Sequence, residues 1–201
     1  FVLPPKLAPI QVVIVPIYKK QEQFEAVSAK AEEIKHDLEE KGIAVKYDNR
    51  DTQKPGFKFA QYEAEGIPLR IGVGPRDVKN GNLELARRDT LKKNIVPRDG
   101  AAEHVSGLLK TIQNDLFEAA KKRRDERTTF VDDYETFKKE MENGGFIYAH
   151  WDGTDETEAK IKEETKATIR CIPLEDDKTE NGQCMVTGKP SESRVLFAKA
   201  Y

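Results

Sequence analysis

The side chains best suited to chemistry in this sequence are the charged ones between residues 70 and 98. Eight of them are basic and three are acidic, a local net charge of +5 in a chain whose overall charge is −2. The basic residues are Arg70, Arg76, Lys79, Arg87, Arg88, Lys92, Lys93 and Arg98. Residues 131–201 carry ten Lys and Arg against sixteen Asp and Glu, a net charge of −6. A polyanion site is therefore predicted in the first part of the chain, although a solvated charged face would show the same pattern.

The sequence contains no obvious residue set for nucleophilic or metal chemistry. The three histidines, His36, His104 and His150, lie outside nucleophile and metal motifs and are predicted to be surface or packing residues. The two cysteines, Cys171 and Cys184, can form at most one bridge, which suits a reducing cytosol. We therefore expect a cytoplasmic protein segment that binds rather than catalyses.

Length and composition predict two domains. The chain has 201 residues, of which 37% are hydrophobic, enough for one good core and a smaller second one. Its longest apolar run, residues 12–17, is interrupted by Pro16 and is far shorter than the roughly 20 residues that cross a bilayer, so no membrane partner is expected. The sequence starts without Met or a signal peptide, which is typical of a segment taken from a longer protein.

Hydrophobic spacing predicts an α/β fold for residues 1–128. Residues 10–17 form a β-branched run typical of a strand covered on both faces, and apolar residues at spacings of three and four predict a helix over 21–41. Further strands are predicted at residues 44–48, 69–73, 83–89 and 94–96, and further helices at residues 57–65 and 99–124, with Asp99 as N-cap. A βαβ succession implies parallel strands, while a turn at 79–82 implies an antiparallel hairpin. We expect a five-stranded mixed sheet flanked by about three helices.

Residues 129–201 are predicted to form a small α+β domain, because apolar spacing lapses into charge near residues 125–129. One helix is expected around Phe137 and a second over residues 156–168. Strands are expected at residues 146–149, 168–173 and 195–198, with a polar loop at 175–183.

Five segments together resemble a known family. They are residues 3–18 (Leu-Pro-Pro-Lys through Pro-Ile-Tyr), 48–51 (Asp-Asn-Arg-Asp), 55–59 (Pro-Gly-Phe-Lys-Phe), 72–77 (Gly-Val-Gly-Pro-Arg-Asp) and 195–201 (Val-Leu-Phe-Ala-Lys-Ala-Tyr). In this combination the chain resembles the C-terminal part of prolyl-tRNA synthetases, class II enzymes, of the archaeal and eukaryotic type. The resemblance implies an anticodon-binding domain followed by a terminal domain that carries zinc in many relatives.

The resemblance also implies what the parent protein does. It would be a proline–tRNA ligase, using ATP and Mg²⁺ in a catalytic domain that lies upstream of these residues, and a homodimer through that domain. The expected partners of this chain are tRNA-Pro and its own catalytic domain. By itself the chain is expected to be inactive and to hold no cofactor.

The family's anticodon contacts map by resemblance onto five positions. They are Glu63, Arg70, Arg76, Asp77 and Lys92. The proline anticodon ends in two guanines, whose Watson–Crick edge donates two N–H groups suited to a carboxylate, and whose O6 and N7 accept from Arg or Lys. Phosphate contacts are expected from Arg87, Arg88 or Lys93. The alternative is that Arg70 merely forms an exposed ion pair with Glu63 or Asp77.

The family's zinc ligands, four cysteines, map onto Asp152, Thr157, Cys184 and Thr187. One thiol of four remains, and threonine is a poor zinc ligand, so zinc is expected to be absent. An alternative ligand set would combine Cys171, Cys184, His150 and Asp152.

Two other functions stay open. One is the related anticodon-binding domain of a threonyl-, glycyl- or histidyl-tRNA synthetase, which lacks the acidic terminal domain. The other is a protein-interaction module, for which that acidic domain would be the contact surface.

Overall fold

The computed structural model describes residues 1–174 and 180–199 of the chain. They divide into two compact units, residues 1–118 and 119–201. The boundary falls within helix α4 (Ala101–Asp125), whereas the sequence predicts domains of residues 1–128 and 129–201. Across the described ranges, no helix combines the length and apolar content needed to span a bilayer.

The first unit is built on a five-stranded mixed sheet, which confirms the predicted fold class. Its strands are β1 (Val12–Pro16), β2 (Val45–Tyr47), β3 (Leu69–Val73), β4 (Asn82–Arg87) and β5 (Lys93–Pro97). They lie in the order β2-β1-β3-β4-β5. β1 pairs in parallel with β2 and β3, whereas β3–β4 and β4–β5 are antiparallel.

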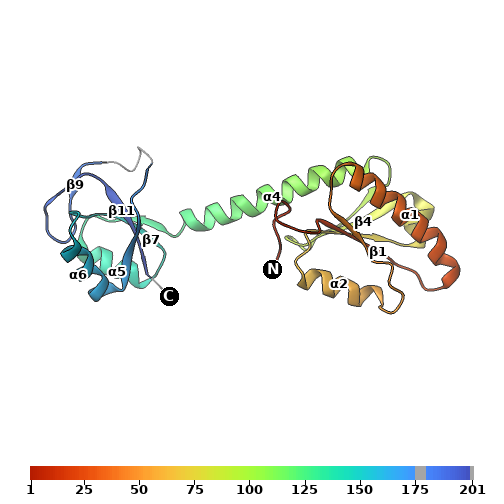
Figure 1. The fold of residues 1–201 in the computed structure, drawn as a ribbon, viewed down its shortest axis with the longest axis horizontal. Coiled ribbons are helices and arrows are strands. Elements are labelled where there is room, and N and C mark those ends of the chain that lie inside the picture. The colour runs from red at the N-terminus through yellow and green to blue at the C-terminus, as the bar shows by residue number, and fades with distance from the viewer. Residues whose placement is uncertain (175–179, 200–201) are drawn as a thin grey trace. The chain divides into compact units, whose positions relative to one another are not determined.

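Helices cover both faces of this sheet. They are α1 (Gln21–Glu40), α2 (Pro55–Ala64), α3 (Pro75–Asn80) and α4. Side chains alternate along a strand, so Val12 and Ile14 face the core beneath α1 and α4, while Val13 and Val15 face α2. Figure 1 shows α1 and α2 on opposite sides of the sheet. Arg70 is paired with Val13 in register and therefore lies on the α2 side.

Two local predictions in this unit are wrong. The connection from β3 to β4 is the short helix α3 rather than a hairpin turn at residues 79–82. Pro75 starts this helix, the Asp77 carboxylate accepts a hydrogen bond from the Gly74 N–H at 2.8 Å, and Gly81 ends it at a φ of 64°. Helix α4 begins at Ala101, so the N-cap position belongs to Gly100 and not to Asp99.

The second unit holds a four-stranded sheet, β6-β7-β11-β8. Its strands are β6 (Thr128–Phe130), β7 (Phe146–His150), β8 (Ala167–Cys171) and β11 (Arg194–Lys199). A small hairpin of β9 (Gly182–Gln183) and β10 (Pro190–Ser191) accompanies it. Strand β6, parallel to β7, lies at the stretch predicted to be a domain boundary. It was not predicted, because three largely exposed residues that follow a run of charges carry no apolar pattern. Of the predicted polar loop at 175–183, residues 175–179 lie outside the described residues.

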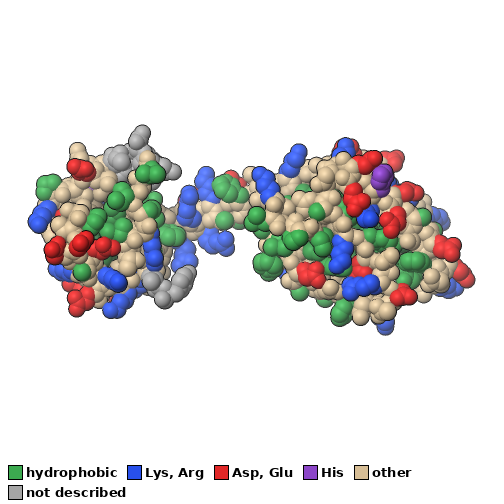
Figure 2. Space-filling view, in the orientation of Figure 1, with side chains coloured by type: hydrophobic (Ala, Val, Ile, Leu, Met, Phe, Trp, Pro, Cys, Tyr) green, Lys and Arg blue, Asp and Glu red, His purple; other side chains and the backbone are tan. Residues whose placement is uncertain are grey.

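One face of the second sheet packs on α5 (Tyr134–Glu142) and α6 (Asp155–Thr165), which Figure 1 shows on the same side. The core there is centred on Phe137 and Phe197, whose ring centroids are 5.1 Å apart. The two units thus have separate cores. On the face drawn in Figure 2, acidic and basic side chains are interspersed over the first unit.

Candidate nucleic-acid interface

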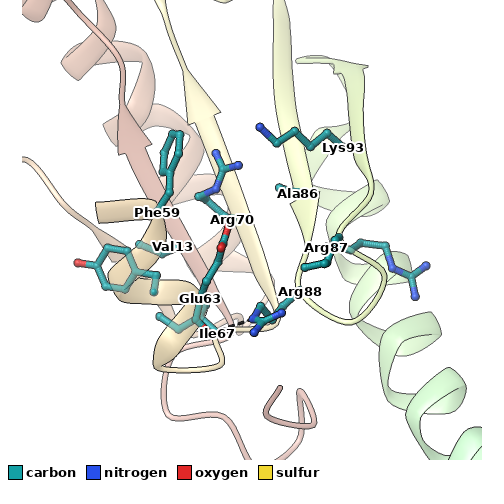
Figure 3. A pocket seen from close by; sticks show the side chains of 11 residues that line it. Val13, Phe59, Glu63, Ile67, Arg70, Ala86, Arg87, Arg88 and Lys93 are labelled. Carbon is teal, nitrogen blue, oxygen red and sulfur yellow. Dashed lines mark hydrogen bonds between the residues drawn. The ribbon is translucent and has the colours of Figure 1, made fainter. Parts of the chain in front are cut away.

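A pocket of about 220 Å³ opens on the α2 side of the first sheet, between α2, β3 and β4 (Figure 3). Its lining residues are Val13, Phe59, Tyr62, Glu63, Ile67, Arg70, Ala86, Arg87, Arg88, Leu91 and Lys93. The lining is therefore largely apolar, with one carboxylate and several cationic side chains. Such a lining suits a flat ring with polar edges.

Arg70 is the most buried charged residue of this lining, with 5% of its surface exposed. Its guanidinium lies over the ring of Phe59, 3.7 Å from the ring centroid, and Nη1 donates to Glu84 Oε1 at 3.2 Å. Stacking fixes the plane of the guanidinium and the carboxylate fixes its rotation. The expected alternative, an exposed pair of Arg70 with Glu63 or Asp77, is wrong, because Arg70 is buried and bonded to Glu84.

The cross-strand register leaves room beside Arg70. Arg70 on β3 pairs with Ala86 on β4, and Ala86 pairs with Lys93 on β5, so the three side chains form a row on one face. The small Ala86 separates the two cations. Lys93 Nζ lies 3.8 Å from Glu84 Oε1, the same oxygen that Arg70 contacts. Two cations on one carboxylate leave the row with net positive charge.

Glu63 supplies the carboxylate of the pocket. It lies near the C-terminal end of α2, its side chain is exposed, and Figure 3 shows it extending toward Arg70. Its main-chain oxygen accepts a hydrogen bond from Arg88 Nε at 2.9 Å, which ties the end of α2 to the end of β4. The structure thus brings Glu63 and Arg70 to one pocket, as the family resemblance implies.

The other three candidate residues lie outside this lining. Arg76 is exposed on α3, and the half-buried Asp77 caps that helix at the far end of β3. Arg70 and Gly74 are four residue steps apart along extended chain, a distance of roughly 13 Å. Lys92 is exposed in the β4–β5 connection, and its neighbour Lys93 is the one that lines the pocket.

The guanidinium of Arg87 forms hydrogen bonds with two carboxylates of the protein. Its Nε and Nη2 donate to the two carboxylate oxygens of Asp89 at 3.0 and 2.6 Å, and Nη2 also donates to Asp115 at 2.6 Å. The hydrogen bond to Asp89 raises the pKa of Arg87 despite partial burial. Figure 3 shows its guanidinium pointing away from the pocket. Its charge is balanced within the protein, so Arg88 and Lys93 are better placed for phosphates.

A buried polar cluster holds α2 against the sheet. The Asp48 carboxylate accepts from Tyr62 Oη at 2.9 Å and from Arg50 at 2.9 and 2.7 Å, while Lys58 Nζ donates to the Asp48 main-chain oxygen at 2.9 Å. Burial alone would raise the pKa of Asp48, but hydrogen bonds from Arg50 and Tyr62 outweigh it and hold that pKa well below its usual range. Burial and the bond to Asp48 raise the pKa of Tyr62 to about 12.

This cluster positions two residues of the pocket, because Phe59 and Glu63 stand on the same helix as Lys58 and Tyr62. Sequence reasoning missed the roles of Phe59, Glu84 and Ala86. The Phe-Lys-Phe run at residues 57–59 was visible as a motif, yet only the strand order shows that its last aromatic ring meets Arg70.

The first domain belongs by sequence match to the anticodon-binding domains, a class with which its mixed sheet and polar pocket are consistent. Residues 11–108 match the family described as anticodon binding domain, and residues 134–201 match the family described as prolyl-tRNA synthetase, C-terminal. Over its whole length the chain is similar to the C-terminal region of prolyl-tRNA synthetases.

Three curated relatives agree with this assignment, and all three are called proline–tRNA ligase. The protein of Porphyromonas gingivalis strain W83 is 60% identical over 200 residues, and that of Flavobacterium psychrophilum is 59% identical over 201 residues. The protein of Bacteroides fragilis strain NCTC 9343 is 57% identical over 203 residues. Each alignment covers 100% of this chain but only 40% or 41% of the relative, so the chain spans about two fifths of these proteins.

Proposed function

We propose that the pocket between α2 and β3 binds a guanine of the tRNA-Pro anticodon. The observation that carries this proposal is the buried guanidinium of Arg70, stacked on Phe59, in one pocket with the Glu63 carboxylate. A carboxylate accepts from N1–H and the 2-amino group of guanine, and a guanidinium or ammonium donates to O6 or N7. No other base offers both sets of groups in this arrangement.

Arg76, Asp77 and Lys92 are proposed to contact a neighbouring nucleotide rather than the same base. For Arg76 and Asp77 the separation from the pocket along β3 supports this division, because one base cannot span roughly 13 Å. Lys92 is assigned with them because it lies outside the pocket lining, next to Lys93. Arg88 and Lys93, at the pocket, are proposed to meet the phosphates on either side of the bound base.

For the parent protein we propose ATP-dependent ligation of proline to tRNA-Pro, with Mg²⁺, in a catalytic domain outside these residues. Homodimerisation, contact with that domain and a cytoplasmic location belong to the same proposal. The names of the curated relatives support the ligase activity. The archaeal and eukaryotic type is proposed from the resemblance of the five segments taken together, while the relatives reported above come from bacteria. The matches to both domains favour this proposal over a threonyl, glycyl or histidyl enzyme or an interaction module.

Binding of anticodon stem-loops with guanine or inosine tests the proposal. Inosine lacks only the 2-amino group, so the wild-type chain should bind the inosine loop roughly 1–3 kcal/mol more weakly. Glu63→Gln should bind the guanine loop more weakly and should lose most of this discrimination. Glu65→Gln, an exposed carboxylate on the turn that follows α2, is the matched control and should keep it. Equal discrimination by wild type and Glu63→Gln would refute the assignment of Glu63.

A further inference from the structure

The second unit contains a cluster of polar side chains that the proposed function does not use. Its centre is the carboxylate of Asp152, in the turn between β7 and α6. Oδ2 accepts a hydrogen bond from Thr187 Oγ1 at 2.9 Å and another from Thr157 Oγ1 at 3.1 Å. Thr187 is 35 residues away in sequence, so this one oxygen joins two distant turns.

The other carboxylate oxygen holds the first turn in shape. Oδ1 of Asp152 accepts from the Thr154 N–H at 3.3 Å and from Thr154 Oγ1 at 2.9 Å. Thr154 is the N-cap of α6, and its hydroxyl also lies 2.9 Å from Thr157 Oγ1. Thr157 is buried on the first turn of that helix. Asp152 therefore organises the start of α6 as well as the link to Thr187.

The second turn is closed by its own backbone. The Gly188 N–H donates to the Cys184 oxygen at 2.8 Å, and the Cys184 N–H donates to the Lys189 oxygen at 2.8 Å. The thiol of Cys184 is free and the residue is only 3% exposed. The Met185 N–H donates to the His150 oxygen at 3.1 Å, which fastens this turn to the end of β7.

These contacts join three of the four positions that correspond to zinc ligands in the resemblance, and Cys184, the fourth, begins the turn that carries Thr187. The donor set does not fit zinc, which is held by thiolate, imidazole and carboxylate rather than by hydroxyl groups. The hydroxyl groups of Thr157 and Thr187 instead donate hydrogen bonds to the Asp152 carboxylate. Within residues 1–174 and 180–199, no group of three or more His, Cys, Asp or Glu side chains is placed to hold a metal ion.

The alternative ligand set is not assembled in the structure. Cys171 is exposed on β8 whereas Cys184 is buried, and the His150 Nδ1 lies 3.1 Å from Ser191 Oγ. This alternative prediction is wrong for the described part of the chain.

We propose that the Asp152 carboxylate takes the structural place of a metal ion, joining the turn at 152–157 to the turn at 184–188 as a metal-free latch. A metal ion joins two turns by attracting their ligands, and here one anion does so by accepting hydrogen bonds from both. Hydrogen bonds to an ionised carboxylate are stronger than those between neutral groups, which suits a link that must replace coordination.

Conversion of the latch into a zinc site tests this inference. The triple variant Asp152→Cys, Thr157→Cys, Thr187→Cys, together with Cys184, provides four thiols. The 201-residue wild-type chain should purify without stoichiometric zinc, and a chelator should leave its Tm unchanged. The triple variant should bind one zinc per chain by metal analysis, and chelation should lower its Tm. Adding Cys184→Ser to the triple variant is the matched control and should reduce the zinc content or the affinity.

Stoichiometric zinc in the wild-type chain would overturn the proposal. Failure of the folded triple variant to take up zinc would show that the four positions do not surround one point, and would also overturn it. If the triple variant does not fold, the single variants Thr157→Val and Thr187→Val and their combination decide the matter. Each should lower the Tm of the second unit by a few degrees, as should Asp152→Asn. Adding them to Asp152→Asn should cost less than the sum of their separate effects, and additive effects would count against a shared centre.

Discussion

At the scale of single residues, the identity of the cation in the pocket matters more than its charge. Arg70 uses the flat face of its guanidinium on Phe59 and one edge on Glu84, which leaves the opposite edge for a ligand. A lysine ammonium cannot stack in this way and has no planar edge. The same position filled by Lys would keep the charge but lose the orientation.

Arg70→Lys is therefore expected to weaken binding of the guanine-containing anticodon loop by roughly 1–3 kcal/mol. Its free energy of unfolding should change less than its RNA affinity, because Lys keeps a positive charge near Glu84 and the larger apolar core lies on the other face of the sheet. Fluorescence titration of the loop and urea unfolding measure the two quantities. Arg123→Lys, at an exposed position of α4, is the control and should bind as wild type does. Unchanged affinity in Arg70→Lys would mean that the pocket does not read the base.

At the scale of elements, α2 is held in register by charge as well as by apolar packing. Lys58 and Asp48 are 1% and 3% exposed, and Lys58 Nζ lies 3.4 Å from Asp48 Oδ1. A buried ion pair is costly to break, since one partner is left charged and without its counterion. The position of Phe59 and Glu63 therefore depends on Asp48, which contacts neither of them in the hydrogen bonds described above.

Asp48→Asn should lower the free energy of unfolding at pH 7 by roughly 3–5 kcal/mol. The pKa of Asp48 is lowered in the folded state from an ordinary value of 3.8. Its ionised form thus stabilises the fold above about pH 4, and that contribution is lost as the pH falls below 3.8. The difference between wild type and variant should shrink over the same range in urea unfolding. Asp51→Asn, an exposed neighbour, should show neither effect. A difference independent of pH would contradict the role of the Asp48 charge.

At the scale of the whole molecule, the chain consists of two units with separate apolar cores. Phe137 and Phe197 lie in the core of the second unit, whereas the pocket residues lie on the first. A substitution in the core of the second unit should therefore leave the binding pocket of the first unit unchanged. The reason is that the core clusters of the two units have no residue in common.

Phe137→Ala should destabilise the second unit by roughly 3–5 kcal/mol, because it removes a fully buried ring. The affinity for the anticodon loop should stay within about twofold of wild type. Differential scanning calorimetry and loop titration on the same preparation test both statements. Phe137→Leu is the conservative control and should lose less stability. A large drop in loop affinity for Phe137→Ala would show that RNA binding depends on the second unit.

The sequence by itself determined the elements and their approximate ends. The long helices and central strands followed from apolar spacing. Pro75 starts α3 and Gly81 ends it through local backbone geometry. The family resemblance singled out Glu63 and Arg70, which line one pocket in the structure, and their contact with the anticodon stays a prediction. Strand β6, where local signals were weak, was not predicted, and the hairpin turn predicted at the position of α3 was wrong.

Only the tertiary structure decided which of these residues meet. Strand order and register bring Arg70 against Glu84 and Phe59, put Ala86 between Arg70 and Lys93, and leave Asp77 as a helix cap. The link of Asp152 to Thr187 likewise spans two turns that no local pattern connects. Side-chain contacts across a sheet depend on pairings between segments far apart in the chain, and such pairings are set by the free energy of the whole core rather than by the residues of either segment.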